Sequence, residues 1–283
     1  MPTHPSARVQ QAREALASRL RELRLDAGIT ARELAIRCQW SESKSSRIEH
    51  AKTPPSDADI GAWCRACEAE GQTADLIAAN RHADAMYVEW RRLQCGGLRQ
   101  LQESGAGLYR RTQLFRVYCS NVVPGFLQGP GYATALMSSS AAFRGTPDDV
   151  SEAVAARMER SRVVHEGGHR FAVLVEEAVL RYRIGDADTM AAQLGSLLSA
   201  IALPSVSLGV IPFNVSRSMW PLETFTIFDD LQVHTDSLTA AVTLTQPTEV
   251  ALYARAFEEL ARLAVHGSEA RALITAALGT LDD

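Results

Sequence analysis

The sequence predicts an α+β fold, with an all-helical N-terminal domain of about five helices and a larger domain that mixes helices and strands. Three observations support this. Apolar residues recur at helical spacing through the first part of the chain. From about residue 80, runs rich in β-branched residues alternate with helical stretches. Charge is distributed unevenly along the chain. Residues up to Pro55 carry ten basic and six acidic side chains, whereas the remaining residues carry 19 basic and 27 acidic side chains. We therefore predict two domains, 1–79 and 80–283.

The first helix is predicted over residues 8–26. Leu16, Leu20 and Leu23 fall on one face of that helix. Gly28 follows where a C-terminal cap would fall, so the helix is expected to end just before it.

Serine and threonine caps mark the next two helices. Thr30 is followed three residues later by Glu33, a capping-box pattern that predicts a helix over residues 31–38. Ser41 caps a third helix that runs to about His50.

The fourth and fifth helices complete the first domain. After the sequence "TPP", Ser56 caps a helix that covers "DADIGAWCRACEA". Gly71 breaks this helix, and a further helical stretch is predicted from about Thr73 to Gln94.

The larger domain begins with "LFRVYCSNVV", which mixes strand-like residues with turn residues further on. The next predicted elements are a short helix at about Tyr132–Met137, a long helix from Pro147 to about His165, a strand at "RFAVLVEEAVLRY" and a helix from Asp186. Three strand-like runs follow, "VSLGVIPF", "TFTIFDD" and "LQVHTDSLTAAVTL", before two helices at about 247–265 and 268–279.

Composition limits the class of protein. The chain is 46% hydrophobic and 22% charged, as globular proteins are, whereas disordered chains have fewer apolar residues and more net charge. No run of about 18 apolar residues predicts a membrane helix, and the first twenty residues lack the apolar centre of a signal peptide. We expect a cytoplasmic protein with no membrane partner.

The cysteines indicate thiols and no disulfide framework. They are Cys38, Cys64, Cys67, Cys95 and Cys119, an odd set that fits a reducing compartment. Cys64 and Cys67 form a CxxC, but no second CxxC or histidine pair follows at zinc-finger spacing. The sequence therefore predicts ordinary buried thiols at this motif.

The stretch "HEGGH", residues 165–169, matches the His-Glu-x-x-His pattern of zinc proteases. A working site needs both histidines on one helical face, yet each glycine in a helix interior costs about 1 kcal/mol relative to alanine. Gly167 and Gly168 instead predict the turn that ends the long helix, with His165 near the negative end of the helix dipole. We expect no catalytic zinc here, and no other metal or cofactor.

No other pattern indicates catalysis. A nucleophile elbow, a phosphate-binding loop and a dinucleotide fingerprint are not found in the sequence, and the glycines that follow Pro124 match no phosphate loop. Glu176 and Glu177 are neighbours on a predicted strand, so their side chains would point to opposite faces. The sequence therefore predicts a protein that is not an enzyme.

Residues 29–50 fit a helix-turn-helix, in which two short helices cross closely over a tight turn. This arrangement needs a small residue where the helices touch. It also needs apolar residues before the turn, after it and along the inner face of the second helix. The residues that meet these needs are Leu34, Ala35, Cys38, Trp40 and Ile48.

This stretch resembles the Cro/lambda-repressor class of helix-turn-helix, also called the XRE class. Within it, "LRLDAGITARELAIRCQWSESKSSRIEHAKTPPS" is similar to actinobacterial WhiJ-like regulators, which carry a large second domain of unknown function. "VPGFLQGPGYATALM", "VAARMERSRVV", "FAVLVEEAVLRYRIGDADTMAAQLGSLL" and "VSLGVIPF" resemble that second domain. The resemblance therefore covers nearly the whole chain.

The resemblance implies a sequence-specific transcriptional regulator, expected to be a repressor that binds double-stranded DNA as a homodimer. WhiJ-like proteins are commonly encoded beside a small partner protein, in an arrangement like an antitoxin pair. The second domain is therefore expected to bind such a partner and to dimerise. Two alternatives stay open: a metabolite-responsive one-component regulator, and an antitoxin-like protein that mainly neutralises its small partner.

Two positions depart from the class pattern. Gln39 stands where the turn usually has glycine, which places a non-glycine residue at positive φ, a somewhat strained conformation. Ser45 stands where the inner face usually carries valine or isoleucine, so its hydroxyl needs a partner such as a carbonyl one turn back.

The recognition helix is predicted to present a polar face to DNA. Lys44 and Arg47 can reach phosphate or a guanine edge, and serine hydroxyls can bond either phosphates or bases. A solvated helix face is the alternative, but the net charge of +4 up to Pro55, against −8 in the rest, favours DNA. The predicted DNA-binding residues are Ser41, Glu42, Ser43, Lys44, Ser46 and Arg47.

Two features of the second domain are candidates for binding a ligand or a partner protein. Aromatic residues before the core strands fit a packed core, with a ligand cavity as the alternative. These residues are Tyr109, Phe115, Tyr118, Phe126 and Tyr132. Trp220, in the loop "SRSMWPLETF", would either anchor an interface or lie against its own domain.

Overall fold

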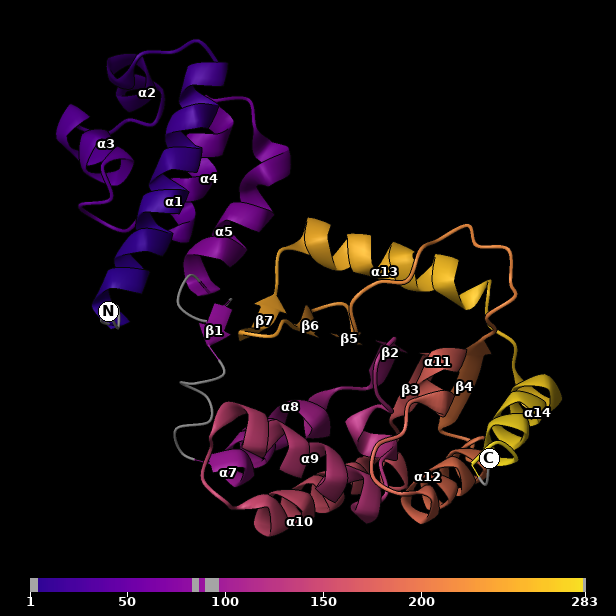
Figure 1. The fold of residues 1–283 in the computed structure, drawn as a ribbon. Helices are drawn as coiled ribbons and strands as arrows, with labels where there is room; N and C mark the ends of the chain where they lie inside the picture. The colour runs from indigo at the N-terminus through magenta and orange to yellow at the C-terminus, as the bar shows by residue number, and fades with distance from the viewer. Residues whose placement is uncertain (1–4, 83–86, 90–96, 282–283) are drawn as a thin grey trace. The chain divides into compact units, whose positions relative to one another are not determined.

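The computed structural model describes residues 5–82, 87–89 and 97–281 (Figure 1). Contacts between residues divide the chain into two compact units. The first comprises Met1–Tyr87 and Thr243–Val250, and the second comprises Val88–Val242 and Ala251–Asp283.

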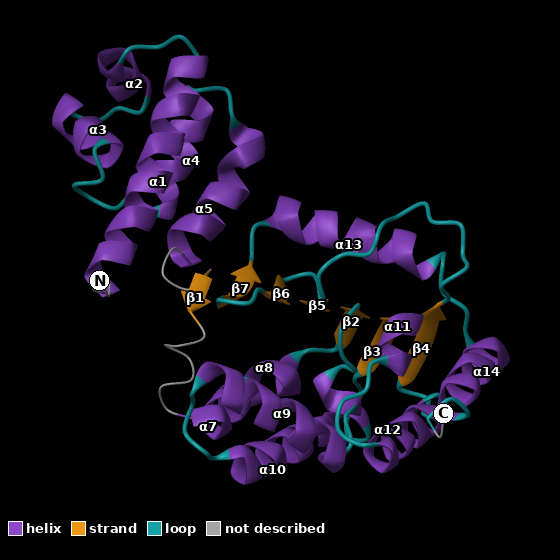
Figure 2. Cartoon of the chain, viewed as in Figure 1, coloured by secondary structure: helices purple, strands orange, loops and turns teal. Residues whose placement is uncertain are grey.

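Helices make up most of the first unit, which confirms the predicted all-helical head. They are α1 (Pro5–Asp26), α2 (Ala31–Arg37), α3 (Glu42–Glu49), α4 (Asp57–Ala66) and α5 (Thr73–His82), with a short 3-10 helix at Glu70–Gln72. Figure 2 shows how loops join these helices.

The apolar faces of the helices meet in one core. Leu16, Leu20 and Leu23 of α1 are buried there, as their spacing predicts. Trp63 of α4 is fully buried, and its indole Nε1 donates to the carbonyl of Leu20 at 2.9 Å. Gly28 follows α1 with a φ of 68°, the left-handed conformation expected of a glycine that ends a helix.

Side-chain caps start the helices where the sequence places them. The Ser56 hydroxyl accepts from the amide of Asp59 at 3.2 Å, and the Asp59 carboxylate accepts from the amide of Ser56 at 3.0 Å. Thr30 caps α2 by accepting from the amide of Glu33 at 3.1 Å. The Glu33 carboxylate pairs with Arg37 at 2.6 Å, so only half of the predicted capping box forms at α2.

The fifth helix ends earlier than predicted. It stops at His82, and Tyr87–Glu89 form the short strand β1, where one helix to Gln94 was expected. Tyrosine and valine favour extended backbone, so the local sequence opposes helix at this point. Residues 83–86 and 90–96, with Cys95 among them, lie outside the described part of the chain.

One mixed sheet forms the centre of the second unit. Its strands follow the order β7-β6-β5-β2-β3-β4, and β1 extends the order beyond β7. Strands β2, β3 and β4 run parallel, whereas β5 is antiparallel to β2 and to β6. The strands are β2 (Leu114–Cys119), β3 (Arg170–Glu176), β4 (Val206–Ile211), β5 (Phe225–Phe228), β6 (Gln232–Asp236) and β7 (Ala240–Leu244).

Helices lie on both sides of this sheet, with α13 on one side and α9, α10 and α12 on the other (Figure 2). None of the helices in the described ranges is both long and apolar enough to cross a bilayer. The helices are α7 (Gly97–Ser104), α8 (Ala106–Arg111), α9 (Pro130–Arg144), α10 (Val150–Ser161), α11 (Glu177–Arg181), α12 (Ala187–Ala200), α13 (Pro247–Ala261) and α14 (Gly267–Leu278), with 3-10 turns at Gly125–Leu127 and Arg162–Val164.

Several elements of the second unit differ from the prediction. Helices α7 and α8 were not predicted, and α10 is shorter than the helix expected from Pro147 to about His165. Helix α9 is longer than Tyr132–Met137, because Pro130 starts it and Gly145, with a φ of 64°, ends it. The predicted strand through Tyr182 stops at Glu176, and α11 follows at once. The run "LQVHTDSLTAAVTL" divides into β6 and β7.

Four of the five aromatic residues are buried in the core of this unit, as the packed-core interpretation predicts, whereas Tyr109 is half-buried. Phe115 and Phe171 stack across β2 and β3 with ring centroids 4.5 Å apart, and Phe126 lies 4.9 Å from Phe171. Tyr118 and Tyr132 are also buried. The parallel strands are thus held together by ring packing as well as by their hydrogen bonds.

Candidate nucleic-acid interface

Helices α2 and α3 and the turn between them form the helix-turn-helix. The amide of Trp40 donates to the carbonyl of Ala35 at 2.8 Å and closes the turn. Gln39 sits in that turn with a φ of 57°, so the predicted positive φ at this residue is confirmed. The turn therefore sets the angle at which α3 leaves α2.

The inner face of α3 packs into the head. Ile48 is buried at 2% exposure, and Ser45 is fully buried. The Ser45 hydroxyl donates to the carbonyl of Glu42 at 3.2 Å, which confirms the expected partner about one turn back. This local bond lets a serine occupy an apolar position without leaving a buried hydroxyl unsatisfied.

The outer face of α3 is open to solvent. Ser41 is its N-cap, and the Ser41 hydroxyl accepts from the amide of Lys44 at 3.2 Å. The exposed residues among the predicted DNA-binding set are Ser41, Glu42, Ser43, Ser46 and Arg47. Within the described residues, Arg47 forms no ion pair, so its guanidinium is available to a phosphate or a base.

Lys44 is half-exposed and forms an ion pair within the head. Its ammonium Nζ lies 2.5 Å from Oδ1 of Asp59 and 4.4 Å from the ring centroid of Trp40. Burial raises the pKa of Asp59, but hydrogen bonds from Lys44 and Ser56 outweigh burial and leave that pKa below its usual value. Lys44 thus ties α3 to the start of α4, although its side chain is still 38% exposed.

Two further cations flank α3, and sequence reasoning did not assign them to the interface. Arg32 lies in the first turn of α2, and its Nε is 3.5 Å from the Glu42 carboxylate with both side chains largely exposed. Lys52 is exposed just after α3, and its amide donates to the carbonyl of Arg47 at 2.8 Å. The capping pattern at Thr30 was the signal that could have identified Arg32, because it places this residue at the start of α2.

A buried ion pair holds the end of α3 against α1. Nη2 of Arg24 lies 2.5 Å from Oε1 of Glu49, with side-chain exposures of only 10% and 5%. Arg24 also donates to the carbonyl of Ile29 at 2.9 Å, which satisfies a second edge of its guanidinium. The recognition helix is therefore fixed at both ends, by Lys44 near its start and by Glu49 near its end.

The CxxC thiols lie in the same core. Cys64 is fully buried and Cys67 is 6% exposed, which confirms the prediction of buried thiols. Burial raises the pKa of Cys64, Cys38 and Cys67, the last to about 11. Within the described residues, no group of three or more His, Cys, Asp and Glu side chains is arranged to hold a metal ion.

The sequence "HEGGH" forms a turn, as predicted. Helix α10 ends at Ser161, a 3-10 turn follows, and Gly167 adopts a φ of 78° before β3 begins. His169 places its Nδ1 2.6 Å from the carbonyl oxygen of Thr112. The two histidines of the motif therefore do not share one helical face.

Glu176 and Glu177 have separate partners. Glu176, the last residue of β3, accepts from the Tyr118 hydroxyl at 2.8 Å and from Nη1 of Arg217 at 3.0 Å. Glu177, the first residue of α11, pairs with Arg181 at 2.8 Å. Burial and the bond to Glu176 raise the pKa of Tyr118. Both carboxylates thus neutralise arginines of their own domain.

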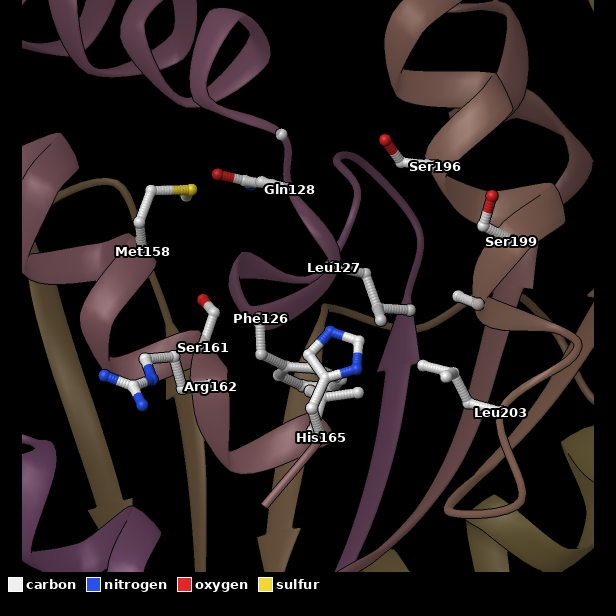
Figure 3. A pocket seen from close by; sticks show the side chains of 13 residues that line it. Phe126, Leu127, Gln128, Met158, Ser161, Arg162, His165, Ser196, Ser199 and Leu203 are labelled. Atoms are coloured by element: carbon white, nitrogen blue, oxygen red, sulfur yellow. The ribbon is translucent and has the colours of Figure 1, made fainter.

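A cavity of about 390 Å³ lies between α10 and α12. Met158 and Ser161 border it on one side, Ser196 and Ser199 on the other, and His165 also faces it (Figure 3). The three serine hydroxyls donate to carbonyls one turn back on their own helices, at 2.8 to 3.1 Å. The polar groups of this cavity are therefore already satisfied in part by the fold itself.

An apolar surface, here called the Trp220 surface, surrounds a cavity of about 420 Å³. Its members include Met219, Trp220, Leu222, Leu252 and Tyr253. The loop lies against its own domain, because the amide of Leu222 donates to the Tyr118 hydroxyl at 3.3 Å, while Trp220 itself is 67% exposed and Leu252 is 53% exposed. Exposed large apolar side chains that adjoin one another are typical of contact surfaces.

Comparisons with known proteins identify both parts of the chain. A helix-turn-helix domain family matches residues 15–77, and a family described as a domain of unknown function, DUF5753, matches residues 106–276. No curated protein matches the chain.

Two solved structures show limited similarity. Nuc, a phospholipase D family member from Salmonella typhimurium, is 12% identical, covers 64% of this chain and 95% of its own, and has a TM-score of 0.35. TrmBL2, an archaeal chromatin protein with a novel mode of DNA binding, is 11% identical to this chain and has a TM-score of 0.32. The match covers 84% of this chain and 88% of TrmBL2. At these scores neither structure bears on what this chain does.

Proposed function

This chain belongs to the DUF5753 family and carries a helix-turn-helix domain before the family domain, and we propose that it is a sequence-specific transcriptional repressor. The observation that supports the proposal is the outer face of α3. Ser43, Ser46 and Arg47 are exposed on a helix that is anchored through Lys44 and Glu49. A rigid helix with free polar side chains is what reading base edges in the major groove requires.

The first prediction concerns Arg47. Arg47→Ala should weaken binding to the operator by about 1–3 kcal/mol if its guanidinium bonds a guanine edge. Lys44→Ala should weaken binding less, because the Lys44 ammonium is already engaged by Asp59. The operator would first be located by chromatin immunoprecipitation with sequencing, and affinities would then be measured by fluorescence anisotropy at several salt concentrations.

Arg65 gives a matched control, since it is an exposed arginine of the same head on α4. Arg65→Ala should leave operator affinity close to that of the unchanged protein. Equal losses for Arg65→Ala and Arg47→Ala would mean that only overall charge matters, and an unaffected Arg47→Ala variant would remove α3 from the interface.

We further propose that a small partner protein controls the repressor through the Trp220 surface, and that the chain has no catalytic role. Trp220 has the exposure and the apolar surroundings of a residue that anchors an interface. A metabolite-responsive regulator is the second candidate, favoured by the cavities of the second unit.

The second prediction tests partner control. Trp220→Ala should weaken binding of the small protein encoded beside this one by about 2 kcal/mol or more, as loss of an interface anchor does. Phe143→Ala is the control, because Phe143 is 74% exposed on α9 but lies outside the Trp220 surface. Isothermal titration calorimetry measures both, and a Trp220→Ala variant that binds as tightly as the control would locate the contact elsewhere.

A further inference from the structure

A second cavity, of about 460 Å³, lies among α7, α8, α10 and the turn before β3. Its volume falls within the range of small-molecule sites. Tyr109 of α8 forms part of its wall and packs against Phe115 with ring centroids 5.3 Å apart. Ala106 and Val163 add apolar surface.

The carboxylates that line this cavity all have arginine partners. Glu103 pairs with Arg99 at 2.7 Å. Glu159 and Glu166 both pair with Arg162, at 3.3 and 2.6 Å. Arg162 balances only one of Glu159 and Glu166, so one negative charge of the lining remains.

Two guanidiniums beside the cavity share one neutral acceptor. Oε1 of Gln102 accepts from Nε of Arg157 at 3.1 Å and from Nη2 of Arg160 at 2.9 Å. Arg157 also donates to Oε1 of Gln128 at 2.5 Å, and Arg160 lies 4.7 Å over the ring of Tyr109. Within the described residues, neither arginine pairs with a carboxylate. Burial, and then repulsion by Arg160, lowers the pKa of Arg157 to about 10.

Two like charges held together in a partly buried place are costly unless an anion accompanies them. The amide oxygens and the aromatic ring offset only part of that cost, since none of them carries a full negative charge. A further cation, Arg110, lines the same cavity and is exposed. The lining holds three arginines and three glutamates, and Arg99 and Arg157, which bond to lining residues, make the total charge positive. This positive charge lies beside an aromatic and aliphatic wall.

We propose that this cavity binds a small organic anion, whose carboxylate or phosphate group pairs with Arg160 while its apolar body lies against Tyr109. The cavity of Figure 3 lacks this combination, because Arg162, which borders both, is already paired with Glu159 and Glu166. The site does not depend on DNA binding, and direct measurement of binding keeps the two proposals separable.

The test uses phenyl phosphate and benzoate as probes, with inorganic phosphate and the neutral benzyl alcohol for comparison. Isothermal titration calorimetry on the full chain should show saturable binding of one equivalent of the organic anions and none of benzyl alcohol. Arg160→Gln should weaken that binding about tenfold, the size of one charge-assisted contact. Arg160→Lys, which keeps the charge, should weaken it less.

A matched pair on α8 supplies the control. Arg110 lines the cavity and the adjacent Arg111 does not, although both are exposed arginines. Arg110→Gln should weaken phenyl phosphate binding severalfold and Arg111→Gln should leave it within twofold. No saturable binding of either organic anion at millimolar concentration, or equal effects of the two α8 variants, would overturn the proposal. Inorganic phosphate that binds as tightly as phenyl phosphate would refute the role given to Tyr109.

Discussion

His234 of β6 is a half-buried titratable side chain, with its Nε2 3.1 Å from Nε2 of Gln232. Its ring centroid lies 4.6 Å from that of Phe228, and burial lowers the pKa of His234 to about 4. An unfolded histidine titrates near 6.5. As pH falls from 6.5 to 4, the unfolded chain gains a proton that the folded chain does not, so the free energy of unfolding should decrease, by up to about 3 kcal/mol.

The measurement for this third prediction compares urea denaturation of the unchanged protein and of His234→Gln across that pH range. The difference in unfolding free energy between the two proteins should shrink or change sign toward pH 4, since only one of them carries the imidazole. Above pH 7 the difference should stay constant. Parallel curves down to pH 4 would show that His234 is protonated in the folded state.

Residues also differ in how well their conformation and partners can be predicted from the sequence alone. Gln39 and Ser45 were placed correctly, because a turn position and a helical phase fix their surroundings within a few residues. The ion pair of Lys44 was not predicted, although the helical phase puts its Cα on the polar side. Its partner Asp59 lies fifteen residues further on, at the start of another helix, and no local pattern reveals that pairing.

Helices and strands, like single residues, were predicted correctly where local contacts determine them and incorrectly where distant contacts do. Helices α2, α3 and α4 begin at their predicted caps because each cap bonds an amide three residues away. Helix α11 was missed, since its first residue, Glu177, accepts from the amide of Phe213, 36 residues distant. Long-range contacts of this kind also explain why the strand-like run 170–182 divides into a strand and a helix.

The fourth prediction concerns the attachment of α3 to α1. Glu49→Ala should destabilise the first unit by about 3 kcal/mol, because it leaves the guanidinium of Arg24 buried without its counter-ion. Differential scanning calorimetry of the full chain would detect this as a lower unfolding temperature of one transition.

Glu22→Ala provides the comparison, since Glu22 pairs with Arg19 on the surface of the same unit. Exposed pairs contribute about 0–1 kcal/mol, so this variant should unfold close to the unchanged protein. A Glu49→Ala variant no less stable than Glu22→Ala would show that the buried pair does not hold α3.

On the scale of the whole molecule, the fifth prediction is a homodimer in which the second unit supplies the interface. One helix-turn-helix buries too little surface for tight specific binding, whereas two heads can occupy half-sites about 34 Å apart. Sedimentation velocity of the full chain should therefore show a dimer, and the operator complex should contain two chains. A monomer that binds DNA one to one with full affinity would contradict this.

The membership of Thr243–Val250 in the first unit has a consequence for the order in which a new chain matures. The hydroxyl of Thr248 donates to Oδ2 of Asp75 at 2.6 Å, and its amide donates to Oδ1 at 3.2 Å. A ribosome releases α1 to α5 long before it reaches this segment. The head on a nascent chain therefore lacks these two hydrogen bonds until most of the second unit has been translated. A message truncated before Thr243 would yield a head in which Asp75 has no Thr248 to accept these bonds from.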